Sequence, residues 1–229
     1  MSPGKTAGRA LQKVDRGTLH DRVYHEIRRG LLNGTFAPGS TMSLQALADR
    51  VGTSIMPVRD ALRRLVIEHA LDLRPNRMIL VPILTAERLN EVRDLRLALE
   101  SMAGALSVGR ITERDLEELT SIAEKAGGRR ELATANDLML DQSFYFTIYR
   151  AAGRPIMLSM IDALWLQIGP LLSDRIRRTG KRLDPQHHHA ALAALRARNA
   201  KAAGRAIAAA VLASSELMID TARGGQVST

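Results

Sequence analysis

The feature that most constrains the fold is the succession of short patterned segments in residues 19–81. The first segment has an apolar residue at every fourth position, and this spacing predicts a helix that ends near Asn33-Gly34. The positions are Leu19, Val23, Ile27 and Leu31. A turn follows, and then Ser43 and Gly52 are suited to cap the start and the end of a second, short helix.

A third helix and a hairpin complete this block. Ser54 is suited to cap the helix, and one side of the helix is apolar. The apolar positions are Val58, Ala61, Leu62 and Leu65. Two short apolar runs flank the turn-prone Pro75-Asn76 and end at Pro82, which predicts a two-stranded wing. Helix, helix, tight turn, helix and wing predict a winged helix-turn-helix domain over residues 17–82.

The remainder of the chain has a different pattern. Over residues 85–222 every long segment has helical period, and no segment alternates like a strand. Thr112 with Asp115 resembles a capping box, and Asn199 is suited to cap the last helix. We expect about six helices, one of them kinked at Gly169-Pro170. The predicted fold class is all-α with a small β wing: a winged helix-turn-helix plus an antiparallel helical bundle.

Composition narrows the function classes. There is no cysteine, which excludes disulfide and thiolate chemistry and fits a reducing cytoplasm. No apolar run reaches the roughly 18 residues that span a bilayer, so no membrane partner is expected. The net charge is +9, and residues 1–84 carry +6 of it, so an acidic partner such as DNA is favoured. Residues 1–16 are basic and are predicted to be a disordered tail.

The predicted third helix is the candidate DNA-reading element. In a helix-turn-helix, the N-terminal residues of this helix face base edges in the major groove, here Ser54, Ile55, Met56 and Arg59. Arg59 lies on the polar side and is suited to bond guanine or a phosphate. Arg63 follows it and is a candidate phosphate contact. The alternative is that these arginines only decorate a solvated helix face.

The same segment carries a family resemblance. Residues 47–65, preceded by Phe36-Ala-Pro-Gly39, resemble the GntR family of regulators, whose pattern has Leu-Ala followed by Gly-Val-Ser-Arg-Thr-Pro-Val-Arg-Glu-Ala-Leu. The resemblance covers residues 18–82. It implies a winged helix-turn-helix that binds a palindromic, double-stranded operator as a homodimer.

The departures from that pattern predict an atypical operator. Ile55 and Met56 stand where the family has Arg and Thr, and Leu44-Gln45 replaces its Glu-Arg. Gln45 is suited to read adenine, and Ile55 or Met56 to pack against a thymine methyl group. In the wing the predicted contacts are Asn76 and Arg77, beside a Met in place of the usual Gly. The alternative function is an interaction protein of this fold that has lost sequence-specific DNA reading.

The C-terminal part resembles the all-helical effector (FCD) domain of the FadR-type branch of that family. The matching segments are residues 96–100, 141–153 and 188–199. The resemblance implies a dimerisation and effector-binding domain over residues 85–222, which holds a small organic acid, often with a divalent metal. The implied protein is a ligand-responsive transcription regulator of the cytoplasm, with repression as the expected mode.

The metal set of the family is incomplete in this chain. The family pattern places Asp and His four residues apart and a further His on each of two later helices. Here the corresponding residues are Asp141, Tyr145, His188 and Ala210. Two ligands rarely hold a transition metal firmly, so we expect a metal-free pocket and no cofactor. Were a metal bound, Asp141 and His188 would hold it.

Polar side chains are then expected to contact the effector. They are Arg96, Asp141, Tyr145, Arg150 and His188. The alternatives are that Asp141 and Tyr145 are ordinary partners in a helical core, and that Arg96 with Glu100 is a plain helix salt bridge.

Other conspicuous residues have simpler structural interpretations. The run His187-His188-His189 cannot chelate one ion, because consecutive helical residues point about 100° apart. Trp165 and the aromatic residues near Tyr145 are expected to be core packing. No nucleophile–base motif or phosphate-binding glycine loop favours an enzyme.

Overall fold

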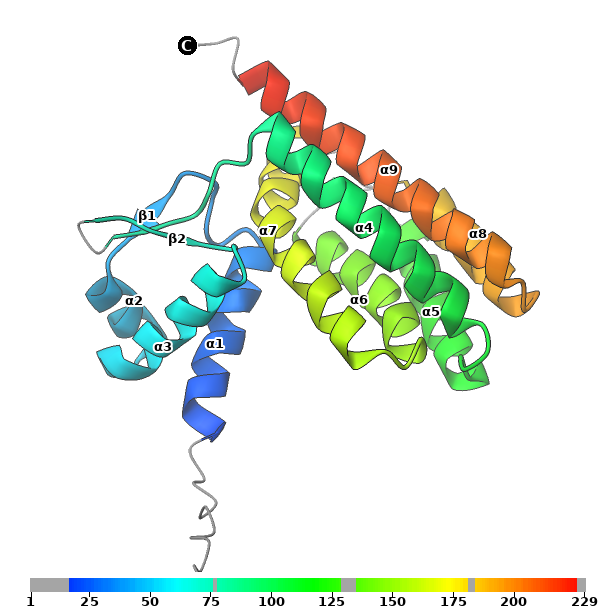
Figure 1. Ribbon diagram of the computed structural model, residues 1–229, viewed down its shortest axis with the longest axis horizontal. Coiled ribbons are helices and arrows are strands. Elements are labelled where there is room, and N and C mark those ends of the chain that lie inside the picture. The colour runs from blue at the N-terminus through cyan, green and yellow to red at the C-terminus, as the bar shows by residue number, and fades with distance from the viewer. Residues whose placement is uncertain (1–16, 76–77, 129–134, 181–183, 226–229) are drawn as a thin grey trace, which may run out of the picture.

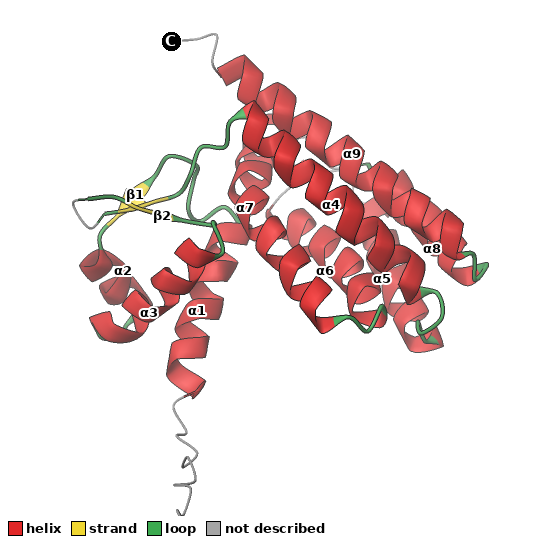
Figure 2. Cartoon of the chain, viewed as in Figure 1, coloured by secondary structure: helices red, strands yellow, loops and turns green. Residues whose placement is uncertain are grey.

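A computed structural model describes residues 17–75, 78–128, 135–180 and 184–225. The chain forms two parts that contact each other along one side, an N-terminal domain with three helices and a small sheet, and a bundle of longer helices (Figure 1). Among these described residues, strands occur only in the N-terminal part (Figure 2). The predicted tail at 1–16 and the predicted wing contacts Asn76 and Arg77 lie outside the described residues.

The helices of the N-terminal domain begin and end close to where the caps predict. They are α1 Gly17–Leu32, α2 Leu44–Val51 and α3 Ile55–Ile67. The Ser43 hydroxyl accepts a hydrogen bond from the amide of Ala46 at 3.1 Å, and Gly52 ends α2 with φ 73°. That left-handed conformation costs glycine little. Ser54 stands at the start of α3 without a side-chain capping bond.

The sheet has one strand more than predicted. The hairpin of β2 (Asp72–Leu73) and β3 (Ile79–Leu80) is confirmed, and β1 (Thr41–Met42) pairs antiparallel with the other edge of β3. Two residues are too few to show alternation, so β1 has no sequence signal of its own. It joins the loop before α2 to the wing and so fixes the wing relative to the helix-turn-helix.

The apolar stripes of α1 and α3 face each other in the domain core. Every predicted stripe residue of α3 is buried, and so are Val23, Ile27 and Leu31 of α1. Leu19, at the free N-terminal end of α1, is 51% exposed. The core is therefore built by α1 against α3, with the wing and Leu71 closing one side.

The bundle has six helices within the described ranges, as predicted. They are α4 Ala86–Ser107, α5 Glu113–Gly128, α6 Ala135–Ala151, α7 Pro155–Thr179, α8 Gln186–Arg196 and α9 Ala200–Gly225. Thr112 and Asp115 cap each other's amides, and Asn199 accepts from Ala202 at 2.9 Å. The α7 helix runs without interruption through Gly169-Pro170.

The first and last helices of the bundle are its closest pair. They lie side by side (Figure 1) and run antiparallel, because Gly104 of α4 meets Ile207 while Arg96 meets Ser214. A Cβ atom added at Gly104 would stand 2.6 Å from Ile207 Cγ1, and one at Gly204 would stand 3.1 Å from the Ser101 carbonyl oxygen. Glycine on both helices thus allows this close approach.

The α7 helix belongs to both parts of the molecule. Leu166 lies in the apolar core of the N-terminal domain, whereas Trp165 lies in the core of the bundle. Ser173 donates to the carbonyl oxygen of Leu32 at 2.7 Å, and Gly169 allows Leu32 to approach the helix backbone. Asp162 forms an ion pair with Arg28 of α1. One face of α7 is therefore the seam between the two domains.

Two helices are long and apolar enough to cross a membrane by length and composition, α7 and the stretch Ala200–Ala222 of α9. About half of each apolar window is buried inside the protein, 56% and 50%. Such helices are also typical of a soluble core, and α7 carries the charged Asp162 and Arg175 toward its protein neighbours.

Candidate ligand pocket and nucleic-acid interface

The N-terminal turn of α3 presents the predicted DNA-reading residues to solvent. Ser54, Met56 and Arg59 are exposed and Ile55 is half-buried, while Pro57 and Val58 between them are buried. Gln45 on α2 is also exposed, and its amide donates to Asp49 at 2.8 Å. The helix therefore offers a mixed cationic and apolar edge beside the wing, which is the arrangement that a recognition helix needs.

The two arginines that follow Arg59 differ in their surroundings. Arg63 is exposed and, with Arg59, flanks an apolar groove of about 570 Å³ between α3 and the wing. Arg64 instead bonds Glu68 at 3.1 Å and lies over the ring of Tyr24 at 3.7 Å. Tyr24 donates to both oxygens of Glu68. Arg64 is thus part of the anchor that fixes α3 to α1.

A cavity of about 240 Å³ lies inside the bundle, lined by residues of α4, α6, α7, α8 and α9. Its acidic, basic and aromatic lining residues are Arg96, Glu100, Asp141, Tyr145, Tyr149, Trp165, Arg175, Asp184 and His187. The remaining lining residues are mostly apolar: Leu172, Ala210, Val211, Ala213, Ser214 and Leu217. The cavity therefore suits a ligand that has both a polar group and an apolar body.

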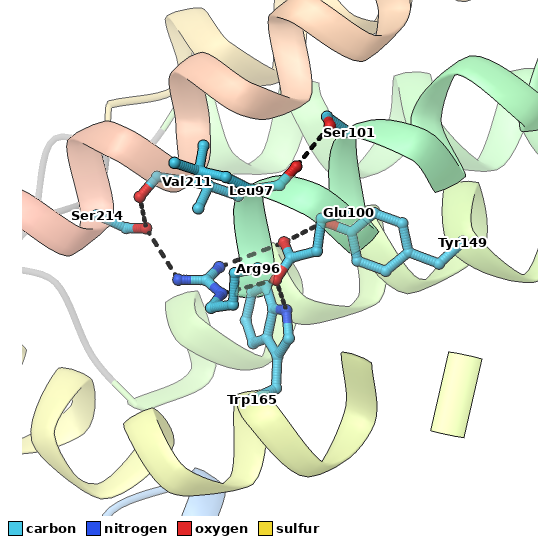
Figure 3. Close-up of polar contacts among 8 residues, drawn as sticks. All are labelled: Arg96, Leu97, Glu100, Ser101, Tyr149, Trp165, Val211 and Ser214. Atoms are coloured by element: carbon cyan, nitrogen blue, oxygen red, sulfur yellow. Dashed lines mark hydrogen bonds and ion pairs between the residues drawn. The ribbon is translucent and has the colours of Figure 1, made fainter. Parts of the chain in front are cut away.

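The Glu100 carboxylate organises the polar part of the cavity (Figure 3). Arg96 donates to it through Nε at 2.6 Å and Nη2 at 3.3 Å. Tyr149 donates at 2.6 Å and the Trp165 indole at 3.1 Å. Arg96 also reaches Ser214 at 3.3 Å. The expected Arg96–Glu100 helix pair therefore exists, but it is buried and joins four helices.

Burial and charge set the protonation of these groups. Burial opposes the charged form of Arg96, but the Glu100 carboxylate outweighs it and raises the pKa of the guanidinium. Burial, reinforced by nearby carboxylates, raises the pKa values of Tyr145 and Tyr149 well above their ordinary range. Both phenols are therefore neutral donors at physiological pH.

The structure brings together four of the five predicted effector contacts. Arg96, Asp141 and Tyr145 line the cavity. His188 lies directly behind them, with its Nε2 atom 2.7 Å from Asp141 Oδ1. Asp141 is thus a core partner of His188 and a lining residue at once.

The prediction for Arg150 was wrong. Its side chain is exposed and donates to the Thr147 hydroxyl at 3.0 Å. Five residues separate it from Tyr145, which turns a helix by about 500° and leaves the two side chains roughly 140° apart. Tyr145 faces the cavity, so Arg150 faces away from it.

Sequence reasoning missed Arg175. This residue lies on α7, is only 7% exposed and lines the cavity. Its Nη1 atom has no hydrogen-bond partner among the described residues. The sequence did contain a signal for it: Arg175 lies on the same helix face as the apolar Leu172 and close to Ile176. Arginine is rarely buried unless its charge has a partner, so an arginine on an apolar face indicates a functional role.

The residues present do not fit a divalent metal. Asp141 and His188 bond each other directly, Tyr145 is held neutral, and Ala210 offers no donor atom at the fourth family position. Within the described ranges, no three His, Cys, Asp or Glu side chains are placed to hold an ion. A transition metal needs three or four such ligands.

Comparison with known proteins places these two parts in known families. Residues 19–81 match the family described as "Bacterial regulatory proteins, gntR family", and residues 91–213 match the FCD domain. The chain is 33% identical to the HTH-type transcriptional regulator McbR of Escherichia coli K12, over 82% of this chain and 86% of McbR. It is 30% identical to the gluconate operon transcriptional repressor of Bacillus subtilis, over 73% and 68% of the two chains.

A solved structure agrees with these matches. The structure of E. coli McbR/YncC superposes with a TM-score of 0.82 at 29% identity, covering 89% of this chain and 98% of that one.

The buried pair predicts a sharp stability difference between two glutamates of α4. Replacing Glu100 by Gln leaves Arg96 buried without its counter-charge, so the free energy of unfolding in urea should fall by about 3–5 kcal/mol. Glu91→Gln is the control, because Glu91 is exposed and its pair with Arg88 contributes at most about 1 kcal/mol.

A milder variant covers the case in which Glu100→Gln does not fold. Tyr149→Phe removes one donor to the carboxylate and should cost about 1.5–3 kcal/mol. Equal, small losses for Glu100→Gln and Glu91→Gln would show that the carboxylate does not organise the bundle.

Proposed function

This chain belongs to the GntR family and carries an FCD domain, and on that premise we propose that it represses transcription as a homodimer whose operator affinity is set by a small organic acid. It is a transcription regulator and not an enzyme, as its families and relatives are. Repression is the mode named for the gluconate operon relative. We expect it to act in the bacterial cytoplasm, where the DNA is.

The observation that carries the DNA-binding proposal is the exposed start of α3 beside the wing. The first turns of a recognition helix must be accessible to DNA. The side chains of Met56 and Arg59 in the first turns of α3 are exposed. The opposite face of α3 is buried against α1. The excess of positive charge in the first 84 residues adds attraction for phosphates.

Selection from random duplexes tests this function. The full-length chain should enrich a palindromic motif, and Arg59→Ala should weaken its binding by about 5- to 150-fold if Arg59 bonds a guanine. If Arg59 instead bonds a phosphate, all sequences should weaken alike and the salt slope should fall by about one. Binding is measured by fluorescence anisotropy over a range of salt concentrations.

Arg114→Ala is the matched control, because Arg114 is an exposed arginine of the bundle, on α5. Failure to enrich any motif, with binding that depends on salt alone, would favour the second candidate function. That candidate is an interaction protein that has lost operator reading, and the replacement of two family residues by Ile55 and Met56 is the observation that favours it.

A homodimer is supported by the outer face of α4 and α9. Three large apolar residues of α4 lie seven and four residues apart, on one face, and are 38–55% exposed: Leu95, Met102 and Leu106. Leu212 of α9 is 41% exposed. An apolar strip of this kind on a soluble protein marks an interaction surface.

Charge selects a second copy as the partner on this surface. The exposed stripe of α9 is basic at its start, apolar in its middle and acidic toward its end. The residues are Lys201, Arg205, Ala209, Leu212, Glu216 and Asp220. A two-fold axis through Leu212 would place the basic end of one α9 against the acidic end of the partner's α9. The surface is therefore complementary to itself, as an isologous interface requires.

Light scattering after size exclusion tests the dimer. The wild-type chain should elute at twice its mass of 25.1 kDa, whereas Met102→Glu, which puts a charge in the apolar strip, should elute as a monomer. Ile156→Glu is the control, because Ile156 is 78% exposed on α7 and should leave the dimer intact. A dimeric Met102→Glu would contradict the assignment.

Charge reversal provides a second arm. Asp220→Arg should weaken the dimer and Arg205→Glu in the same chain should restore it, because an axis through Leu212 puts Arg205 of one copy next to Asp220 of the partner copy. A dimer places two recognition helices about one DNA turn apart, ~34 Å, so the monomeric variant should also bind the operator more weakly.

The α7 seam offers a path from the cavity to the DNA-binding domain. Trp165 and Arg175 line the cavity, while Asp162 and Ser173 on the same helix bond α1. Burial raises the pKa of the Asp162 carboxyl although Arg28 opposes this, so the ion pair is partly desolvated. A ligand that moves α7 would therefore move α1 and change the spacing of the two recognition helices.

Amide hydrogen exchange tests this coupling without a ligand. Asp162→Ala should increase exchange in α1 and change operator affinity, because α1 loses its ion pair to the bundle. Asp174→Ala is the matched control, since Asp174 is also on α7 but, among the described residues, forms ion pairs only with Arg177 and Arg178 of its own helix. If both variants leave α1 exchange unchanged, α7 does not hold α1.

A further inference from the structure

Arg175 is the strongest unexplained feature of the molecule. Its side chain is more than nine-tenths buried, it lines the bundle cavity, and its Nη1 atom has no partner in the part of the chain that the structure describes. A buried donor without an acceptor is costly, and a bound ligand can supply the missing acceptor.

We propose that Arg175 is the anion-binding residue of the cavity, and that the ligand is a compact monocarboxylate with an apolar body, bound without a metal. This inference rests on the effector pocket of the proposed function and names the chemistry that the pocket selects.

The carboxylates around the cavity already accept hydrogen bonds from the protein. Glu100 is engaged by Arg96 and by the donors of Tyr149 and Trp165. Asp141 is bonded to His188. Asp184, at the exposed start of α8, accepts from the backbone and side-chain amides of Gln186. Among the described charged residues that line the cavity, Arg175 is therefore the one with a donor atom that bonds no described residue.

The charges around the cavity limit the number of carboxylates that it accepts. One guanidinium matches one carboxylate, since its fork bonds the two oxygens side by side. Three acidic side chains line the same space, Glu100, Asp141 and Asp184. A second ligand carboxylate would meet their negative potential and find no further arginine with an unbonded donor among the described lining residues. The cavity therefore favours a monocarboxylate over a dicarboxylate.

The size and the apolar lining of the cavity limit the body of the ligand. The cavity has a volume of about 240 Å³, and an apolar protein cavity of roughly 150 Å³ is known to hold benzene. The wall formed by Leu172, Val211 and Leu217 is apolar, and the Trp165 ring lies on the polar side. A single ring or a chain of about six carbons fits this space.

Tyr145 is placed to contribute a second hydrogen bond. It lines the cavity, burial raises the pKa of its phenol so that it remains a donor, and its hydroxyl bonds none of the described residues. Arg175 and Tyr145 come from α7 and α6. A carboxylate between them would join the helix that carries the domain seam to its neighbour.

Thermal melting of the full-length, chelator-treated protein tests the inference. The probes are benzoate, hexanoate, the uncharged benzamide and the dicarboxylate phthalate. At least one of the two monocarboxylates should raise the melting temperature, and benzamide and phthalate should not at the same concentration. Adding Zn²⁺ or Mn²⁺ should leave the monocarboxylate effect unchanged.

Arg175→Met separates a binding role from a structural one. In the absence of ligand this variant should melt higher than the wild type, because it removes a buried guanidinium whose Nη1 atom has no partner among the described residues. Its affinity for the active monocarboxylate should fall by about 10- to 100-fold. Arg177→Met is the control, since Arg177 is exposed on the same helix and pairs with Asp174, and it should change neither property.

Three results would overturn the inference: no probe monocarboxylate stabilises the wild type, benzamide stabilises it as well as benzoate does, or Arg175→Met melts lower and binds unchanged. Selection of DNA motifs is measured on the same preparation. A chain that enriches an operator motif but binds no monocarboxylate refutes only the ligand assignment, whereas a chain that binds benzoate but no specific DNA refutes the regulator and leaves Arg175 as assigned.

Discussion

The bundle depends on one buried carboxylate, that of Glu100. Two charges so far from water are tolerated only where every oxygen and most donors are bonded, and Arg96, Tyr149 and Trp165 meet that condition for Glu100. These residues come from three helices, and Arg96 bonds a fourth through Ser214. The helices α4, α6, α7 and α9 are therefore fixed relative to one another at a single point, and the polar floor of the cavity is rigid for the same reason.

That arrangement explains how a cavity can coexist with a packed core. The aromatic side chains around Glu100 fill the space on one side, while small residues of α9 such as Ala210 and Ala213 leave the other side open. Where the family places a metal ligand, this chain has Ala210, and where it places a second, it has a neutral phenol. The Asp141 carboxylate remains at that place, and guanidinium, phenol and alkyl groups line the space around it.

Much of the fold could be predicted from the sequence because its signals are local. The helices were predicted with small errors at their ends, from helical period, from the caps at Ser43 and Gly52 and from the capping box at Thr112. The strand β1 was missed, since a two-residue strand exists only through its pairing with β3. At the candidate site, the four-residue spacing predicted that Tyr145 shares a helix face with Asp141, and both line the cavity. Of the two predicted arginines, Arg96 lines the cavity and Arg150 is exposed outside it, whereas Arg175, which was not predicted, lines it. Which face of a helix meets a neighbour is decided by tertiary packing.

The close glycine contact between α4 and α9 has a consequence for biosynthesis. It joins the first and last helices of the bundle, so the bundle cannot close until α9 has emerged from the ribosome. The helix-turn-helix emerges far earlier, yet its apolar core is incomplete until Leu166 of α7 is made. Nascent chains therefore expose part of a DNA-binding surface before the sensor exists, and a truncation within α9 would yield a protein whose two halves mature to different extents.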